Sequence, residues 1–387
     1  MDLKEKILKS VESKVDDYMA IVQSLYDHPE IGNQEFESMK LLSQYLRKAG
    51  FAVEEEYILP TGFIGRYESQ KPGPTIAFMC EYDALPEIGH GCGHNLIAAI
   101  GVAAGEALKS VIDECGGTVL VVGTPAEENF GGKVTMSEKG VFDNVDAALM
   151  IHPATRNGVG GKSLAIYPIK FEFFGKSAHG CRPQEGHSAL DAAVMTYTSI
   201  NMLRQFVLPG TFIHGIIKDG GGAANVIPEY ASMEYYFRAP TMKYVMEIVE
   251  KAIHCAQGAC EATFTTMKHS LYETPYDDTL INYTLADLLR EKYQEVGVEN
   301  IEKVDETPLG STDVGAVSYK CPTIQGNIKI AETDVAGHSK EMAAATISPQ
   351  GRQGLIKAAQ ALALSGLELI ENKELLQKAK DEFEKNK

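Results

Sequence analysis

The hydrophobic pattern of the N-terminal part of the chain predicts strands that alternate with helices. Residues 38–49 carry apolar side chains at helical spacing, and this helix is expected to end at Gly50, a residue suited to a C-terminal cap. Three short apolar runs are bounded by Gly, Pro or polar residues, as expected of strands buried on both faces; they are 75–80, 118–123 and 147–151. Helices are predicted between them, at 95–111 and about 131–140. This alternation favours βα units and a mostly parallel sheet.

A different pattern begins after residue 165. Strands and helices are predicted in the order strand, helix, strand, strand, helix, strand, at 166–175, 187–206, 212–221, 231–239, 241–260 and 263–272. This is the order of the split βαβ, ferredoxin-like fold. We therefore expect a small ferredoxin-like α+β domain at 167–279, inserted into a larger α/β domain formed by 1–166 and 280–387. Further helices of the large domain are predicted at 279–296, 349–370 and 373–386.

Length and charge narrow the possible functions. A chain of 387 residues, 44% of them hydrophobic, is expected to form two domains of a soluble globular protein. Its formal net charge of −17 argues against a nucleic acid or an anionic membrane as a partner, because both bind basic surfaces.

The cysteines and the first residues of the chain indicate in which cellular compartment the protein is expected. The first residues indicate a charged amphipathic helix and not a signal peptide, because no apolar core of about 7–15 residues follows them. No apolar run reaches the ~20 residues that a membrane-spanning helix needs. The seven cysteines have no framework spacing, so we expect reduced thiols and a cytoplasmic location.

The candidate chemistry lies where the predicted strands end. The first strand leads into Glu81, Asp83 and "GHGCGHN", the second into "TPAEEN", and the third into a histidine before a proline. The carboxyl ends of parallel strands form the ligand-binding crevice of an open sheet. We therefore expect one site that contains Cys92, His94, Glu127, Glu128 and His152. Nitrogen, sulfur and carboxylate ligands together suit Zn²⁺ or a similar ion, while one of two adjacent glutamates can remain a base.

Two other interpretations compete with a metal site. In the first, Cys92 is the nucleophile of a thiol hydrolase and His94 its base; these residues are two apart, so their contact would need a strained turn. It would also leave the glutamates and His152 without a role. In the second, the chain is a catalytically silent, metal-free scaffold. A base beside a complete ligand set argues against that interpretation.

The motifs "EYDALPEIGHGCGHN", "TPAEEN", "MIHP", "GKSAHG", "GGGAANVIPEY", "YYFRA" and "GSTDVG" occur in the order seen in the di-metal aminoacylase-type metallopeptidases. Over about residues 20–360 the chain resembles the amidohydrolase branch of that family. This branch includes N-acyl-amino-acid amidohydrolases, p-aminobenzoyl-glutamate hydrolase subunits and aminoacylase-like dipeptidases. The resemblance implies the metal ligands Cys92, His94, Glu128, His152 and His338, with Glu127 as general base and Asp83 supporting the metal centre.

The resemblance also implies a mechanism and an assembly. Two divalent ions per subunit are expected, zinc or manganese first, with cobalt or nickel as further options; Glu127 would pass a proton from an activated water to the leaving amine. His179, donated by the other subunit of a homodimer, would stabilise the oxyanion. Asn225 and Arg238 would bind a substrate carboxylate, whereas the orientation of His214 stays open.

The expected substrate is an N-acyl amino acid or a dipeptide with a free carboxylate. Dimerisation is expected through the inserted domain, and a tetramer of such dimers is compatible with it. His90, the remaining histidine of "GHGCGHN", is expected to be structural or to lie beside the ligands.

Overall fold

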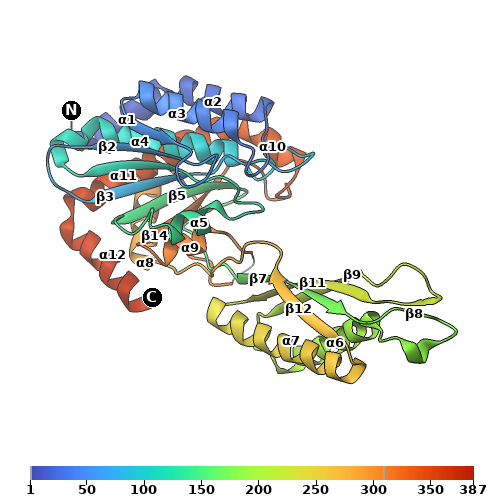
Figure 1. Cartoon of the computed structure of the whole chain (residues 1–387). Coiled ribbons are helices and arrows are strands. Elements are labelled where there is room, and N and C mark those ends of the chain that lie inside the picture. The colour runs from blue at the N-terminus through green and yellow to red at the C-terminus, as the bar shows by residue number, and fades with distance from the viewer. Residues whose placement is uncertain (1, 308–309) are drawn as a thin grey trace. The chain divides into compact units, whose positions relative to one another are not determined.

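The computed structural model describes residues 2–307 and 310–387, and the chain forms two compact units (Figure 1). The large unit contains the residues up to Lys162, together with Thr279–Thr307 and Asp313–Lys387. The insert unit contains Ser163–Asp278 and a short segment that ends at Thr312.

The large unit is built on an eight-stranded sheet. Its strand order is β1-β2-β4-β3-β5-β14-β6-β13. The strands are β1 (Ala52–Glu55), β2 (Phe63–Glu68), β3 (Thr75–Cys80), β4 (Thr118–Gly123), β5 (Ala147–Ala154), β6 (Asn157–Gly158), β13 (Ile301–Glu302) and β14 (Thr323–Lys329). The central strands β4, β3, β5 and β14 are parallel, and β1 and β2 add an antiparallel edge. The prediction of a mostly parallel sheet is therefore confirmed, and the third predicted strand extends to Ala154.

Helices cover both faces of this sheet, which explains the uninterrupted apolar runs of β3 and β4. Along β3, Ile76 and Phe78 lie in one core cluster, whereas Ala77 and Met79 lie in another on the opposite face. The helices of the large unit are α1 (Leu3–Ser13), α2 (Val15–Asp27), α3 (Phe36–Lys48), α4 (His94–Cys115), α5 (Gly132–Glu138), α8 (Tyr283–Glu295), α9 (Val314–Ser318), α10 (Lys340–Thr346), α11 (Pro349–Glu371) and α12 (Lys373–Asn386). In Figure 1, α1–α4 lie along one face, with α5 and α9 on the other.

Helix α4 is the central helix of the large unit. It packs against β3, β4 and β5 and against α1, α2 and α11. By length and composition alone α4 could cross a membrane, but 89% of its most apolar window is buried inside the protein, as in a core helix. Close approach to the sheet needs small residues: a Cβ atom on Gly105 would lie 2.3 Å from Cγ2 of Val121.

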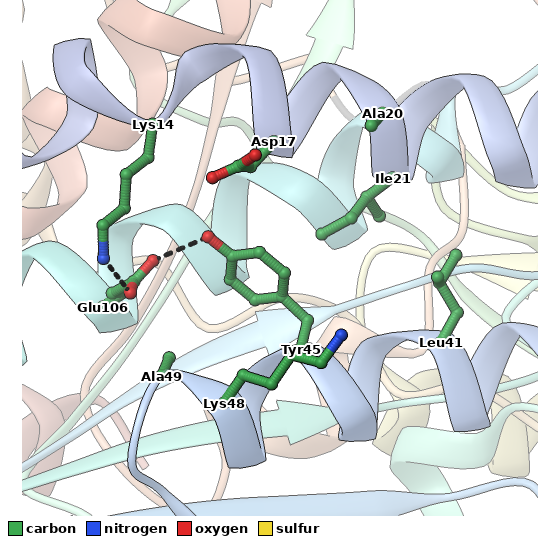
Figure 2. A pocket seen from close by; sticks show the side chains of 9 residues that line it. All are labelled: Lys14, Asp17, Ala20, Ile21, Leu41, Tyr45, Lys48, Ala49 and Glu106. Carbon is green, nitrogen blue, oxygen red and sulfur yellow. Dashed lines mark hydrogen bonds and ion pairs between the residues drawn. The ribbon is translucent and has the colours of Figure 1, made fainter.

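A buried carboxylate ties the N-terminal helices to α4. Glu106 of α4 is 6% exposed and accepts hydrogen bonds from the hydroxyls of Tyr18 (2.8 Å) and Tyr45 (2.9 Å). Lys14, between α1 and α2, forms an ion pair with the same carboxylate (Figure 2). Because a buried charge is costly unless it is paired and hydrogen-bonded, these contacts fix the packing of α2 and α3 on α4.

The insert unit has a four-stranded antiparallel sheet with the order β12-β7-β11-β9. Its strands are β7 (Ala165–Phe174), β9 (Phe212–Asp219), β11 (Tyr230–Ala239) and β12 (Thr266–Leu271), and its helices are α6 (Ala189–Leu203) and α7 (Met242–Thr263). Both helices pack with one side of the sheet in a single core cluster. This arrangement confirms the ferredoxin-like fold. Two short strands, β8 (Ala178–His179) and β10 (Val226–Ile227), pair with each other.

The close packing of α4 leads to a stability prediction. Gly105→Ala should lower the free energy of unfolding by about 1–3 kcal/mol, because the added methyl overpacks the contact with Val121. Gly258→Ala is the matched control: Gly258 lies within α7 with nothing within 4 Å of an added Cβ, so this change should stabilise by roughly 0.5–1 kcal/mol. Calorimetry measures both transitions. An unchanged melting temperature for Gly105→Ala would contradict the packing described.

Candidate metal centre

Four of the five predicted ligands lie near the carboxyl ends of β3, β4 and β5, with His152 inside β5, and His338 lies between β14 and α10. Cys92 and His94 belong to the turn that leads into α4, and His94 is the first residue of that helix. The turn requires glycine at Gly93, which has φ +87° and whose Cβ would lie 2.4 Å from Pro153. The glycine therefore brings two ligand side chains into adjacent positions at the end of the sheet.

The structure brings all five predicted metal ligands together. The ligand atoms of Cys92, His94 and His152 lie within 4.8 Å of one another, and so do those of Cys92, Glu128 and His338. Sγ of Cys92 is 3.4 Å from Nε2 of His152, and Nε2 of His338 is 3.4 Å from Oε1 of Glu128. The two groups share Cys92, so a thiolate there could contact two ions.

Hydrogen bonds orient two of the imidazole ligands. Nδ1–H of His94 donates to the carboxylate of Asp83 (2.9 Å) and to its backbone carbonyl (3.0 Å). Nδ1–H of His152 donates to the carbonyl of Pro153 (2.7 Å). In both rings the Nε2 lone pair is left for a ligand, which is the arrangement that metal-binding histidines adopt.

Asp83 also holds the loop after β4. Its second oxygen accepts the backbone N–H of Glu128 at 3.0 Å. Burial raises the pKa of this carboxyl, but His94 and the Glu128 N–H outweigh burial and lower it to about 2. Asp83 is therefore an ionised anchor that joins two ligand-bearing loops, as expected for a group that supports a metal centre.

The residues of this centre fit a metal ion. Nε2 of His94 and Oε1 of Glu128 are buried, and neither has a hydrogen-bond partner among residues 2–307 and 310–387. Buried polar atoms without partners are rare, and an ion would satisfy both. Thiolate, imidazole and carboxylate form a ligand set that suits Zn²⁺ and related divalent ions.

A buried charge network lies beside Glu127. Nζ of Lys133 is 2.5 Å from Oε1 of Glu81 and 2.8 Å from Oδ1 of Asp313, and all three side chains are at most 1% exposed. Glu81, Glu127 and Asp313 place carboxylate oxygens within 4.8 Å of one another. Burial, followed by the charges of Glu81 and Asp313, raises the pKa of Glu127 well above its ordinary value. Glu127 therefore has a high affinity for a proton.

The sequence did not predict roles for Lys133 and Asp313. Lys133 is the first cation after the "TPAEEN" motif, and this position was the available signal. The pairing with Asp313 was not readable, because 180 positions separate the two residues. His90 gives no ligand atom to these groups. It is 1% exposed, and burial lowers its pKa to about 3, which favours a neutral ring.

The candidate residues of the insert unit lie on its sheet and on the β8–β10 pair. His179 of β8 is exposed, and its Nδ1 accepts the N–H of Cys181 (3.0 Å), so the proton of a neutral ring is on Nε2. Asn225, also exposed, precedes β10, and its carbonyl accepts the N–H of Gly180 at 2.7 Å. The pairing of β8 with β10 therefore brings the His179 and Asn225 segments together.

The orientation of His214 follows from strand register. His214 of β9 pairs with Tyr236 of β11, and Phe212 pairs with Arg238. Directly opposed residues share a face, so His214 and Arg238 both lie on the side of the sheet away from α6 and α7. Arg238 is half-buried, and its Nε has no hydrogen-bond partner within the part of the chain that the structure describes.

Together, the α/β sheet, the inserted unit, the candidate metal-binding groups and the adjacent Glu127 are typical of a hydrolase. The chain belongs to peptidase family M20/M25/M40, whose model matches residues 77–352.

Individual relatives agree with this assignment. The Xaa-Arg dipeptidase of Mus musculus is 35% identical over 98% of this chain and 92% of its own length. A p-aminobenzoyl-glutamate hydrolase subunit of Escherichia coli (strain K12) is 34% identical over 74% of this chain and 64% of its own. The protein is therefore a hydrolase that acts on amide bonds.

Solved structures have the same fold. A putative aminohydrolase from methicillin-resistant Staphylococcus aureus covers 95% of this chain and 100% of its own, with a TM-score of 0.81 at 22% identity. The Bacillus subtilis YXEP protein, described as a dinuclear metal-binding peptidase, covers 91% of this chain and 98% of its own, with a TM-score of 0.67 at 19% identity.

The anchoring role of Asp83 can be tested by metal titration. Asp83→Ala should weaken metal binding about 10–100-fold, because His94 and the Glu128 loop lose the group that orients them. Asp143→Ala, which removes an exposed carboxylate outside the ligand groups, is the control and should leave affinity unchanged. Equal affinity of the Asp83→Ala and parent proteins would contradict the role assigned to Asp83.

Proposed function

We propose that this protein is a metal-dependent dipeptidase that hydrolyses dipeptides whose C-terminal residue is basic. The observation that carries hydrolysis is the pair of ligand groups that share Cys92, with Glu127 next to them. The choice of dipeptides is supported by two Xaa-Arg dipeptidases, from mouse and Homo sapiens, whose similarity extends over 98% of this chain. A p-aminobenzoyl-glutamate or N-acyl-amino-acid substrate is the second candidate, supported by the shorter match to the Escherichia coli hydrolase.

The ligand groups would hold two divalent ions, zinc or manganese by the chemistry of the donor set. Ions bound there would polarise the scissile carbonyl and acidify a water molecule. Glu127 would take a proton from the attacking water and return it to the leaving amine, a task suited to a carboxylate whose pKa is raised by burial. His179 donates its Nε2–H to the oxyanion.

Recognition of the substrate carboxylate is assigned to Arg238 and Asn225. The guanidinium of Arg238 lies over the ring of Tyr236 at 5.8 Å, which holds its plane, and the Nε donor is open. A planar fork of donors suits bidentate binding of a carboxylate. His214 shares this face and can contact the same substrate.

The insert unit also carries the surface for a homodimer. Exposed apolar side chains occur on α6, in the segment after it and on edge strand β9, and we call them the apolar strip: Val194, Met195, Met202, Phe206, Leu208, Phe212 and Ile216. Strand β9 is an edge of the sheet, so its backbone can pair with β9 of a second copy. Such a dimer covers the apolar strip and lets His179 act at the site of the other protomer.

A substrate panel with metal-reconstituted protein tests the proposal. Dipeptides ending in Arg or Lys should be hydrolysed at least about tenfold faster, by kcat/KM, than p-aminobenzoyl-glutamate or N-acetyl amino acids, and a chelator should abolish the activity. Glu127→Gln should keep its metal and lose about 10²–10⁴-fold in kcat. Activity that survives chelation and falls on alkylation of Cys92 would favour the thiol hydrolase instead. Metal-replete protein that holds less than one ion per chain would favour the scaffold.

Complementation between protomers tests the action of His179 in trans. His179→Ala and Glu127→Gln homodimers should each be nearly inactive. Mixing them with exchange of protomers should restore about a quarter of the parent activity, because half of the dimers are hybrids and each hybrid has one intact site. If the mixed sample has a dimeric mass by light scattering but no activity, His179 does not act across the interface.

A further inference from the structure

The segment 30–35, which precedes α3, contacts the loops that carry the ligands. We call it the buttress segment. None of its residues belongs to the ligand groups among the described residues, and the proposed mechanism does not use it. Two of its residues contact Ala126, which directly precedes Glu127 and Glu128.

Ala126 has a backbone conformation that alanine rarely adopts. Its φ is +59°, in the left-handed region, and its side chain is completely buried. This conformation is unfavourable for an L-residue, because it brings the Cβ atom too close to the following carbonyl oxygen. Such residues persist where their surroundings hold them in place, and they cluster at functional sites. The position of Ala126 sets the direction in which the two following glutamates leave the backbone.

Glu35 is the group that holds Ala126. Its Oε1 accepts the backbone N–H of Ala126 at 2.8 Å, and its Oε2 accepts the hydroxyl of Thr61 at 2.8 Å. Glu35, Thr61 and Ala126 are all 0% exposed. A hydrogen bond from a backbone N–H to a buried carboxylate is stronger than one between neutral groups. Burial also raises the pKa of Glu35 to about 7, so this carboxylate is placed there at a cost in stability.

Gly32 supplies a second, independent contact with the same loop. A Cβ atom on Gly32 would lie 3.0 Å from Cα of Ala126 and 2.3 Å from Oδ1 of Asn129. The backbone of the buttress segment therefore packs directly against Ala126, with no room for a side chain. The carbonyl of Ala126 accepts the N–H groups of Phe130 and Gly131, which fixes its other side.

The buttress segment also holds the loop after β3. The N–H of Ala84 donates to the carbonyl of Glu30 at 2.8 Å, and Ile31 forms a β-bridge with Ala84. Ala84 follows Asp83, whose carboxylate binds both His94 and the N–H of Glu128. One short segment thus fixes the two ligand loops relative to each other.

We propose that Glu35 is a positioning residue of the hydrolytic site: by holding Ala126 in the left-handed conformation, its carboxylate aims Glu127 and Glu128 at the reacting groups. The expected effect on kcat rests on the proposed function, because it assumes that Glu127 acts as the base. The expected effect on metal affinity depends on the position of Glu128 and does not depend on the substrate.

Three variants of the full-length, metal-reconstituted protein test the proposal. Glu35→Met keeps the length of the side chain and removes the acceptor. Glu35→Gln retains an oxygen for the Ala126 N–H, while the Thr61 hydroxyl can turn to accept from its amide. Thr61→Val is the matched control, because it costs a buried hydrogen bond of Glu35 and leaves the bond to Ala126 intact.

The expected results separate positioning from stability. Glu35→Met should lose about 10²-fold in kcat with little change in KM, because a displacement of about 1 Å at the base has that effect. Its metal affinity, measured by titration of the metal-free protein, should fall about tenfold as Glu128 moves. Glu35→Gln should recover most of both quantities. Thr61→Val should melt at a lower temperature and keep its kcat and metal affinity.

A glycine at position 126 provides a rescue. Glycine adopts positive φ without strain, so Glu35→Met/Ala126→Gly should regain part of the lost kcat and metal affinity, and it supplies the comparison if Glu35→Met alone does not fold. Parent-like kcat and metal affinity in Glu35→Met, equal losses in Thr61→Val, or a double variant that folds without any recovery would each overturn the proposal. If the parent hydrolyses no dipeptide, the proposed function fails, and metal affinity still decides the role of Glu35.

Discussion

The arrangement of the candidate metal centre depends on the hydrogen bonds of the Asp83 carboxylate. One of its oxygens binds the ring of His94, at the start of α4, and the other binds the N–H of Glu128, in the loop after β4. Both contacts require β3 and β4 to be neighbours in the sheet, with their carboxyl ends at one edge. They also require the tight turn at Gly93, which places His94 above the end of β3. The fold is thus arranged so that one buried anion can organise two loops.

Negative charge is concentrated at this edge of the sheet, and nearby positive charge has to compensate it. Glu81 and Asp313 share the ammonium group of Lys133, which comes from α5 on the second face of the sheet. Glu127 and Glu128 lie in the same region, next to the thiol of Cys92. A buried ammonium between two carboxylates is stable only with close pairing. Ionised Glu128 and Cys92 side chains would add negative charge, which cations would have to balance. Divalent ions at the two ligand groups would complete this balance.

The sequence was informative where local pattern and sheet geometry coincide. The runs 75–80 and 118–123 match β3 and β4, because helices bury both faces of these strands. The residues after them could be placed at one edge for the same reason, although their roles stay predictions. Helix α4 extends to Cys115, beyond its predicted range of 95–111; in its last turn Glu114 pairs with Lys6 of α1 and Asp113 accepts a hydrogen bond from Tyr67 of β2. Tertiary contacts account for what the sequence alone did not show. His338 lies in a segment without apolar periodicity, where its N–H binds the carbonyl of Gly91, and its assignment came from the resemblance. Lys133 lies in α5 and Glu35 lies directly before α3, and solvent exposure is the ordinary expectation for charged residues. Their burial is compensated by partners 180 and 91 positions away, and such pairings leave no local signal.

The two units divide the chemistry between rigid and exposed groups. Within the large unit, the predicted ligands and Glu127 are held by backbone and side-chain contacts from α3, α4, α5 and the buttress segment. Within the insert unit, His179, Asn225 and His214 are exposed, and Arg238 is half-buried on the face of the sheet away from α6 and α7. The predicted ligands are buried or half-buried except for His338, whose side chain is 56% exposed, whereas most of the predicted substrate-binding groups are exposed. Changes of specificity can therefore accumulate on the insert unit at a low cost to the stability of the metal centre.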